Sequence, residues 1–315
     1  MQNREPNMIE SLITKLTLEE KVSLVHGATN FENGRVERLG IPPLVMSDGP
    51  NGVREELGDA RRDDDACTAL PTGIAIAATW DPELAHAYGE VLGAETRARG
   101  KDIILGPAIN IHRTPLCGRN FEYMGEDPLL VSDIVTPFIR GIQSQGVAAC
   151  VKHFALNNQE LERRTVNVEV DERALREIYL PAFEAAVKNG KSLTVMAAYN
   201  QFRGNPCCGN ALLLCDILKN EWGFEGAVIS DWGGASDTEG SATGGLDIEM
   251  GGGPETHLMG APYLEALREG RLDEADLDDK VRRILTVLQA LGNLSACGTG
   301  QWPVLRLVPH AEGQE

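Results

Sequence analysis

Short apolar segments alternate with helical patterns along almost the whole chain, and this alternation restricts the fold more than any other feature. Seven of the segments have the pattern of buried strands: 43–46, 73–76, 102–105, 147–151, 193–198, 227–229 and 246–250. Strands that alternate with helices pack as a parallel sheet covered by the connecting helices. Seven or eight such units favour an α/β fold of the TIM-like (β/α)8 barrel type, complete or lacking a unit. An open doubly wound sheet is the alternative, although the first turn, 47–53, lacks the spaced glycines of a dinucleotide site.

The predicted helices begin and end at residues that satisfy their terminal backbone groups. Thr17 and Glu20 have the spacing of a capping box, in which a hydroxyl and a carboxylate bond each other's free amides. Asp171 can cap a helix that runs to about Lys188 and closes at Gly190. Its apolar residues fall on one face, at positions 175, 178, 182, 183 and 186.

The chain length fits one barrel. A (β/α)8 barrel takes roughly 200 to 400 residues, and the chain has 315. We therefore expect one barrel domain over residues 1–295 and a short irregular tail, 296–315, that forms no domain.

The charge and the apolar content exclude several classes of partner. With 29 basic and 47 acidic residues the net charge is −18, which repels nucleic acid and anionic membranes. No apolar run approaches the roughly 18 residues of a membrane helix, and the N-terminus shows no secretory signal. Seven scattered cysteines suit reduced thiols, and no Cys/His spacing fits a metal site. We expect a cytoplasmic protein without a cofactor, whose partner is small or neutral.

Polar residues follow several of the predicted strands. The carboxyl ends of barrel strands form the floor of an active site, so these side chains are expected to converge. They are Asp48, Lys152, His153, Tyr199, Asn200 and Asp231, together with Arg119 in the segment CGRNFEYMGEDP. Each alone has a plain structural explanation, such as a helix cap, a tight turn or a surface ion pair of Arg119 with Glu122. Together, their charges and hydroxyls suit the many hydroxyl groups of a sugar.

Six segments resemble, in the family's order, the N-terminal barrel of glycoside hydrolase family three, the retaining β-glucosidases and their relatives. They are PLVMSDGPNGVR, CGRNFEYMGEDP, VKHFALNNQE, VMAAYNQFRG, LKNEWGFEGAVISDWGG and GLDIEMGGG. The resemblance covers about residues 9–292. It implies the barrel fold and hydrolysis of β-D-glucosides or oligosaccharides from the non-reducing end.

The resemblance also implies the roles of the charged residues. Asp231 matches the nucleophile, which forms a covalent glycosyl-enzyme, and Asp48 matches the carboxylate that binds the distal hydroxyls of the sugar in the −1 subsite. Arg119, Lys152 and His153 match the basic residues that bind the other hydroxyls. Lys152 and Arg119 should also favour the ionised form of Asp231, which a nucleophile requires.

The remaining candidates form the wall of the pocket. Tyr199 matches an aromatic position beside the nucleophile, and Trp232 offers an apolar surface to a sugar face. Arg113 and Met196 are further candidates for the pocket wall.

This chain departs from the family pattern at the second carboxyl group that a retaining mechanism requires. A protonated group must help the leaving oxygen depart. In most members it is a Glu of a following α/β sandwich domain, whereas here the family-like sequence stops after DDKVRRILTVLQALGNL. Single-domain relatives, the β-N-acetylglucosaminidases, use a loop His, but KHFALNNQELERRTVN lacks their His-Gly-Asp run. Glu160, Glu162 and Glu255 are the acidic candidates within the chain, because they lie on stretches that could reach the mouth of the barrel, but each has the pattern of a solvated loop charge.

Three expectations follow from a missing acid/base residue. Activity should be weak or restricted to activated substrates, because general acid catalysis contributes about 10²–10⁴-fold. The barrel face that normally docks the second domain would be bare and would favour a homo-oligomer. A partner chain that supplies the acid would restore activity.

Two other hypotheses stay open at this point. A barrel that kept the sugar site and lost turnover would bind glucose without forming a covalent adduct. A Schiff-base lyase would use Lys152 as its amine, because a partly desolvated lysine becomes nucleophilic.

Overall fold

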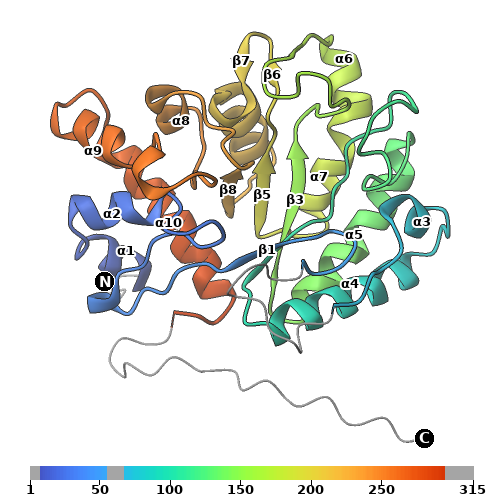
Figure 1. The fold of residues 1–315 in the computed structure, drawn as a ribbon, viewed down its shortest axis with the longest axis horizontal. Coiled ribbons are helices and arrows are strands. Elements are labelled where there is room, and N and C mark those ends of the chain that lie inside the picture. Colours follow the sequence, from blue (N-terminus) through green and yellow to red (C-terminus); the bar gives the residue numbers. More distant parts are fainter. Residues whose placement is uncertain (1–7, 55–66, 295–315) are drawn as a thin grey trace, which may run out of the picture.

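A curled, mostly parallel sheet surrounded by helices forms the fold (Figure 1). The computed structural model describes residues 8–54 and 67–294, so the predicted tail, 296–315, lies outside the described residues. Five parallel strands are neighbours in the order β1 (Met46–Asp48), β2 (Ile103–Leu105), β3 (Ala148–Phe154), β5 (Thr194–Ala197) and β8 (Ala227–Ser230). The expected α/β, barrel-like class is confirmed.

The sheet returns to its first strand through irregular segments. Residues 246–250 lie beside β8, and a short antiparallel segment, 26–33, lies between them and the residue before β1. The successive backbone bridges are Ile229–Ile248, Glu249–His26, Gly27–Asn33 and Glu32–Val45. The ring of backbone contacts is therefore closed, but regular parallel strands make up only part of it.

Two of the seven predicted strands have a different structure. The segment 73–76 lies in the helix α3 (Gly73–Ala77), because a short apolar run fits one face of a helix as well as it fits a strand. Its Ile76 is buried, whereas Ile74 is exposed. The segment 246–250 is extended without being a regular strand. Asp247 explains this, because its carboxylate accepts the backbone N–H of Val228 at 2.7 Å, in the place of a strand carbonyl.

Helices cover both flanks of the sheet (Figure 1). On one flank lie α1 (Met8–Ile13), α2 (Leu18–Leu24), α8 (Thr238–Thr243), α9 (Ala261–Arg268) and α10 (Glu274–Ala290). On the other lie α3, α4 (Pro82–Ala98), α5 (Pro128–Ser144), α6 (Glu172–Ala174) and α7 (Pro181–Lys188). In the described part of the chain, no helix combines the length and the apolar character needed to cross a bilayer.

The helix ends confirm the predicted caps. Thr17 and Glu20 form a complete capping box, with the Glu20 carboxylate accepting the Thr17 N–H at 2.9 Å. Asp171 accepts the N–H of Ala174 at 2.8 Å. The helix that it caps is interrupted, because a π-helical turn, η3 (Leu175–Tyr179), separates α6 from α7. Pro181, which lacks an N–H, stands where the regular α-helical bonds resume.

Two glycines allow α4 and α5 to pack closely. A Cβ added at Gly89 of α4 would lie 2.2 Å from the carbonyl oxygen of Phe138, and one at Gly141 of α5 would lie 2.2 Å from that of His86. The two backbones therefore touch where the helices cross, and no larger residue fits there without a shift.

Smaller elements follow the carboxyl ends of β3 and β5. A second sheet has the order β4 (Asn167–Val168), β6 (Gln201–Phe202) and β7 (Asn205–Pro206). The other helical elements of the described residues are three short 3-10 helices, η1 (Glu37–Leu39), η4 (Cys207–Gly209) and η6 (Pro254–Thr256), and a π-helix, η5 (Leu212–Glu221).

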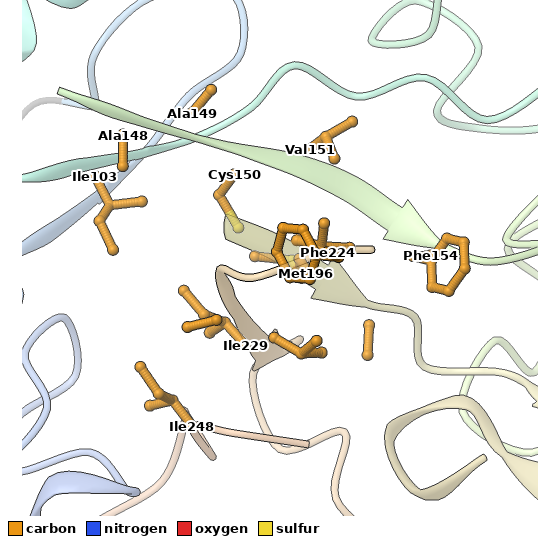
Figure 2. Close-up of a cluster of buried hydrophobic side chains, with 14 of the residues drawn as sticks. Ile103, Ala148, Ala149, Cys150, Val151, Phe154, Met196, Phe224, Ile229 and Ile248 are labelled. Carbon is orange, nitrogen blue, oxygen red and sulfur yellow. The ribbon is translucent and has the colours of Figure 1, made fainter. Parts of the chain in front are cut away.

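The interior of the curled sheet is filled by apolar side chains. Figure 2 shows Cys150 and Val151 of β3, Met196 of β5, Ile229 of β8 and Ile248 in one cluster. All five are at most 2% exposed. The centre of the sheet is thus a packed core, as in other barrels of this kind, and the polar groups lie at the strand ends.

Candidate active site

Polar side chains at the carboxyl ends of three strands come together in space. Asp48 ends β1, Lys152 and His153 lie near the end of β3, and Asp231 follows β8 directly. The Lys152 Nζ is 2.9 Å from Asp48 Oδ1, and His153 Nε2 is 3.7 Å from Asp231 Oδ2. The structure therefore brings together four residues that are 183 positions apart at the extremes, as their strand-end positions predict.

A network of ion pairs connects this group to two loops. Arg119 binds Glu122 through two hydrogen bonds of 2.7 and 2.9 Å, and Glu122 Oε1 is 3.4 Å from Lys152 Nζ. On the other side, Glu160 is 4.0 Å from Arg119 and 3.1 Å from Arg163. The Glu122 side chain is only 7% exposed, so this is not a solvated surface pair. Buried charges need such compensation, because desolvation costs several kcal/mol per ion.

Asp231 has one oxygen satisfied and one left over. Its Oδ1 accepts the N–H of Trp232 at 2.8 Å. Its Oδ2 is buried and has no hydrogen-bond partner among the described residues. Burying an acceptor without a hydrogen bond destabilises the folded state, so a donor on a group that enters the site would find this oxygen available.

The pKa of Asp231 reflects a competition in which burial is the larger effect. Burial raises this pKa above its ordinary value, while the charges of Lys152 and Arg119, the N–H of Trp232 and the nearby Tyr199 hydroxyl lower it. The two cations act in the predicted direction, but they do not outweigh the burial. Their own partners, Asp48 and Glu122, neutralise much of their charge.

The pKa values of three neighbouring groups are shifted in directions that define their protonation states. Burial would raise the pKa of Asp48, but the Lys152 ammonium, by its charge and its hydrogen bond, holds it below its ordinary value. Burial would lower the pKa of Lys152, but Asp48 and Glu122 raise it. Burial lowers the pKa of His153 well below its ordinary value, and the cations Arg119 and Lys152 act in the same direction. Lys152 is thus an ammonium ion, which argues against a Schiff-base amine, and His153 is neutral.

Aromatic side chains stand beside Asp231. The Tyr199 hydroxyl donates to the carbonyl oxygen of Trp232 at 2.9 Å, and the Trp232 indole N–H donates to the carbonyl oxygen of Asn30 at 2.8 Å. The Trp232 ring lies 5.4 Å from that of Phe31, and the Arg163 guanidinium lies 4.6 Å from the Tyr199 ring centre. These contacts fix two aromatic surfaces next to the carboxylate.

Comparison with known proteins gives the family of this chain. The model of the Glycosyl hydrolase family 3 N terminal domain matches residues 9–287. The chain belongs to this family. The resemblance seen in six sequence segments is thereby confirmed.

The relatives of this family 3 chain are longer than it is. The beta-glucosidase BoGH3A of Bacteroides ovatus is 48% identical, over 89% of this chain and 40% of its own length. The thermostable beta-glucosidase B of Acetivibrio thermocellus is 46% identical, over 89% and 37%. The beta-glucosidase 3B of Thermotoga neapolitana, solved in complex with glucose, superposes with a TM-score of 0.86 at 43% identity, over 90% and 43%. The chain thus spans about two fifths of the length of these proteins.

Two further candidates for the pocket wall of the family 3 chain have contacts of their own. Arg113 stacks over Tyr179 of η3, with its guanidinium 5.7 Å from the ring centre. Met196 is 2% exposed and packs in the core cluster of Figure 2. Among the acidic candidates, Glu162 and Glu255 are exposed, as a solvated loop charge would be, whereas Glu160 belongs to the ion network.

Three residues that the sequence did not indicate form hydrogen bonds that position His153 or its neighbour Tyr123. The Tyr123 hydroxyl lies 3.3 Å from His153 Nδ1, and Asn157 Nδ2 donates to that hydroxyl at 3.0 Å. Asn110 binds the backbone of His153 on both sides, accepting its N–H at 2.7 Å and donating to its carbonyl oxygen at 2.9 Å. Tyr123 and Asn157 occur in the segments CGRNFEYMGEDP and VKHFALNNQE, but nothing local distinguishes them from ordinary loop residues. The described residues offer no group of His, Cys, Asp or Glu side chains that could hold a metal ion.

Proposed function

We propose that this chain supplies the nucleophile and the sugar-binding site of a retaining β-glucosidase, which releases glucose from the non-reducing end of β-D-glucosides. The observation that carries the proposal is Asp231, a buried carboxylate with one unsatisfied oxygen, facing His153 beside the Lys152–Asp48 ion pair. The names of the relatives support the substrate class. Those proteins are longer than this chain, so assigning their β-glucosidase activity to it is part of the proposal.

The reaction has two displacements. Asp231 Oδ2 attacks the anomeric carbon, the new bond forms as the bond to the leaving oxygen breaks, and the leaving oxygen takes a proton from an acid. Water then attacks the same carbon, Asp231 departs as a carboxylate, and the water gives its proton to the group that first acted as acid. Two inversions give a product with retained configuration.

The charged neighbours suit the binding of sugar hydroxyls. Asp48, held ionised by Lys152, accepts hydrogen bonds from two hydroxyls, while Lys152 and Arg119 donate to others. Hydrogen bonds with a charged partner are roughly twice as strong as neutral ones, so they orient a neutral substrate well. Tyr199 and Trp232 supply apolar surface to the faces of the sugar.

The acid is the part that this group of residues does not provide. Besides Asp231, its carboxylates are Asp48, Glu122 and Glu160, and each is in an ion pair. Against its burial, Asp48 has its pKa held below the ordinary value by Lys152, which makes it a poor proton donor. The oxygens of Glu122 and Glu160 are engaged by hydrogen bonds from Arg119 and Arg163. We therefore place the acid/base outside this group, and expect substrates with good leaving groups to react while natural glycosides lose about 10²–10⁴-fold in rate.

Covalent labelling tests the proposal. The chain is incubated with a 2-deoxy-2-fluoro-glucoside that carries a dinitrophenolate leaving group, which needs the nucleophile but no acid, and its intact mass is measured. We expect one adduct per chain, which peptide mapping places on Asp231, and none in Asp231→Asn. The exposed-residue variant Asp133→Asn should label like the wild type. A folded chain that binds glucose and forms no adduct would instead be a non-catalytic sugar-binding protein.

Other expectations from the sequence stay predictions. They are the homo-oligomer, the lack of nucleic-acid binding, which the net charge of −18 favours, and the cytoplasmic location. Light scattering coupled to size-exclusion chromatography would measure the first of these directly.

A further inference from the structure

Three buried side chains follow one another in space and lead to the proposed nucleophile. Tyr123 comes from the loop before α5, His153 from β3 and Asp231 from the end of β8. They are 0%, 1% and 8% exposed, respectively. The Tyr123 hydroxyl lies 3.3 Å from His153 Nδ1, and His153 Nε2 lies 3.7 Å from Asp231 Oδ2. Each end of the imidazole therefore faces one particular group.

A neutral imidazole carries one proton, and its position decides what Asp231 meets. If the proton is on Nδ1, the lone pair of Nε2 faces the ionised carboxylate and repels it. If the proton is on Nε2, it is the protonated nitrogen that lies 3.7 Å from Oδ2, the oxygen that has no hydrogen-bond partner among the described residues. The lone pair of Nδ1 then requires a donor, and the Tyr123 hydroxyl is in place to be that donor.

The surroundings of Tyr123 suit a donor. Asn157 Nδ2 donates to the phenolic oxygen at 3.0 Å, which leaves the hydroxyl proton for either His153 Nδ1 or the carbonyl oxygen of Asn157, at 3.2 Å. Burial raises the pKa of Tyr123, so the phenol keeps its proton. The two hydrogen bonds between Asn110 and the His153 backbone hold the residue in register with both neighbours.

We propose that Tyr123 is a positioning residue that donates its hydroxyl proton to His153 Nδ1, and thereby fixes the tautomer whose Nε2–H faces the Asp231 carboxylate. This inference rests on the proposed function, in which that carboxylate is the nucleophile. The charged groups that act on the imidazole are Arg119, Lys152, Arg163 and Asp231. Burial and, after it, the three cations keep the imidazole neutral, so its tautomer, and not its charge, is the property left to be set.

Nitrogen-15 NMR of histidine-labelled protein reads the tautomer directly, because protonated and unprotonated ring nitrogens of a neutral imidazole have different shifts. The chain has six histidines, and His153 is assigned by the signals that His153→Gln removes. In the wild type we expect a protonated Nε2 and an unprotonated Nδ1. In Tyr123→Phe, which keeps the ring and loses the donor, we expect a mixture of the two tautomers.

A matched control separates this role from the general loss of a buried hydroxyl. Tyr263 of α9 is fully buried, and its hydroxyl has no hydrogen-bond partner within the described residues. Tyr263→Phe should leave the signals of His153 unchanged.

The rate of labelling by the fluoro-glucoside supplies the functional readout. Loss of a hydrogen bond that acts on the nucleophile should slow labelling of Tyr123→Phe about 3- to 10-fold. It should also move the acid limb of the pH profile to higher pH, because the ionised form of Asp231 then loses part of its favourable electrostatic contact with the Nε2–H side of the imidazole, 3.7 Å away. The groups that set this limb are Lys152, Arg119, Tyr199 and His153. Tyr263→Phe should show neither effect.

Two results would overturn the inference. One is a wild-type His153 protonated on Nδ1, and the other is a Tyr123→Phe protein with the wild-type tautomer. The wild-type spectrum decides the first even if the variant does not fold. The NMR readout needs no turnover, so a wild-type chain with the expected tautomer but no adduct would contradict the proposed function alone.

Discussion

Lys280 provides a test of how burial sets charge in this barrel. It lies on α10, is 3% exposed, and its ammonium donates to the carbonyl oxygen of Leu246 at 2.6 Å. Burial lowers the pKa of Lys280 from 10.5 to about 8. Asp247 acts against this decrease by attraction, but Asp247 is already paired with Lys219 at 2.7 Å, and Lys219 repels the second ammonium.

The change in pKa predicts a change in stability with pH. A fall from 10.5 to about 8, at about 1.4 kcal/mol per pKa unit, corresponds to about 3 kcal/mol. Between pH 8 and pH 10.5 the unfolded chain binds more protons at this site than the folded chain does, so the free energy of unfolding rises with pH across that window. Below pH 8 the folded state bears the full cost of the buried charge.

Lys280→Met removes the titrating group with little change in volume. We expect the free energy of unfolding of the wild type, relative to the variant, to rise by about 3 kcal/mol between pH 8 and pH 10.5. Urea unfolding at several pH values measures this difference, in which the titration of other groups cancels. The exposed-lysine variant Lys15→Met should parallel the wild type throughout. If Lys280→Met also parallels the wild type over this window, the argument from burial is wrong.

Two further perturbations test the site and the packing. Asp48→Asn removes a charged partner of Lys152, so we expect kcat/KM for an aryl glucoside to fall about 10- to 100-fold, mainly through a higher KM. The control variant Asp133→Asn, on the surface of α5, should have no effect. An unchanged KM in Asp48→Asn would contradict a sugar-binding role for Asp48. Gly141→Ala places a Cβ 2.2 Å from the carbonyl oxygen of His86, so the free energy of unfolding, measured in urea, should fall by about 1–3 kcal/mol. Gly118→Ala, where nothing lies within 4 Å of the added Cβ, should be nearly neutral. Equal stabilities of the two variants would show that α4 and α5 move apart freely.

The sequence by itself determined the features that depend on near neighbours along the chain. The caps at Thr17 and Asp171 form within three residues, so their residue types and spacing suffice to predict them. The alternation of strand and helix patterns predicted a parallel barrel, and the barrel predicted that Asp48, Lys152, His153 and Asp231 would meet at the strand ends. The strand predicted at 73–76 was wrong, because the local signal was weak there and a short apolar run fits a helix as well as a strand.

Only the tertiary structure decided how the charges at the site are partnered. Lys152 pairs with Asp48, 104 positions away, and no local pattern encodes such a contact. The pairing leaves Asp231 with a raised pKa, although the sequence places cations near it. The donor for His153 Nδ1, Tyr123, also became visible only in three dimensions. The physical reason is that burial and long-range pairing set protonation, and both depend on which segments the folded chain brings together.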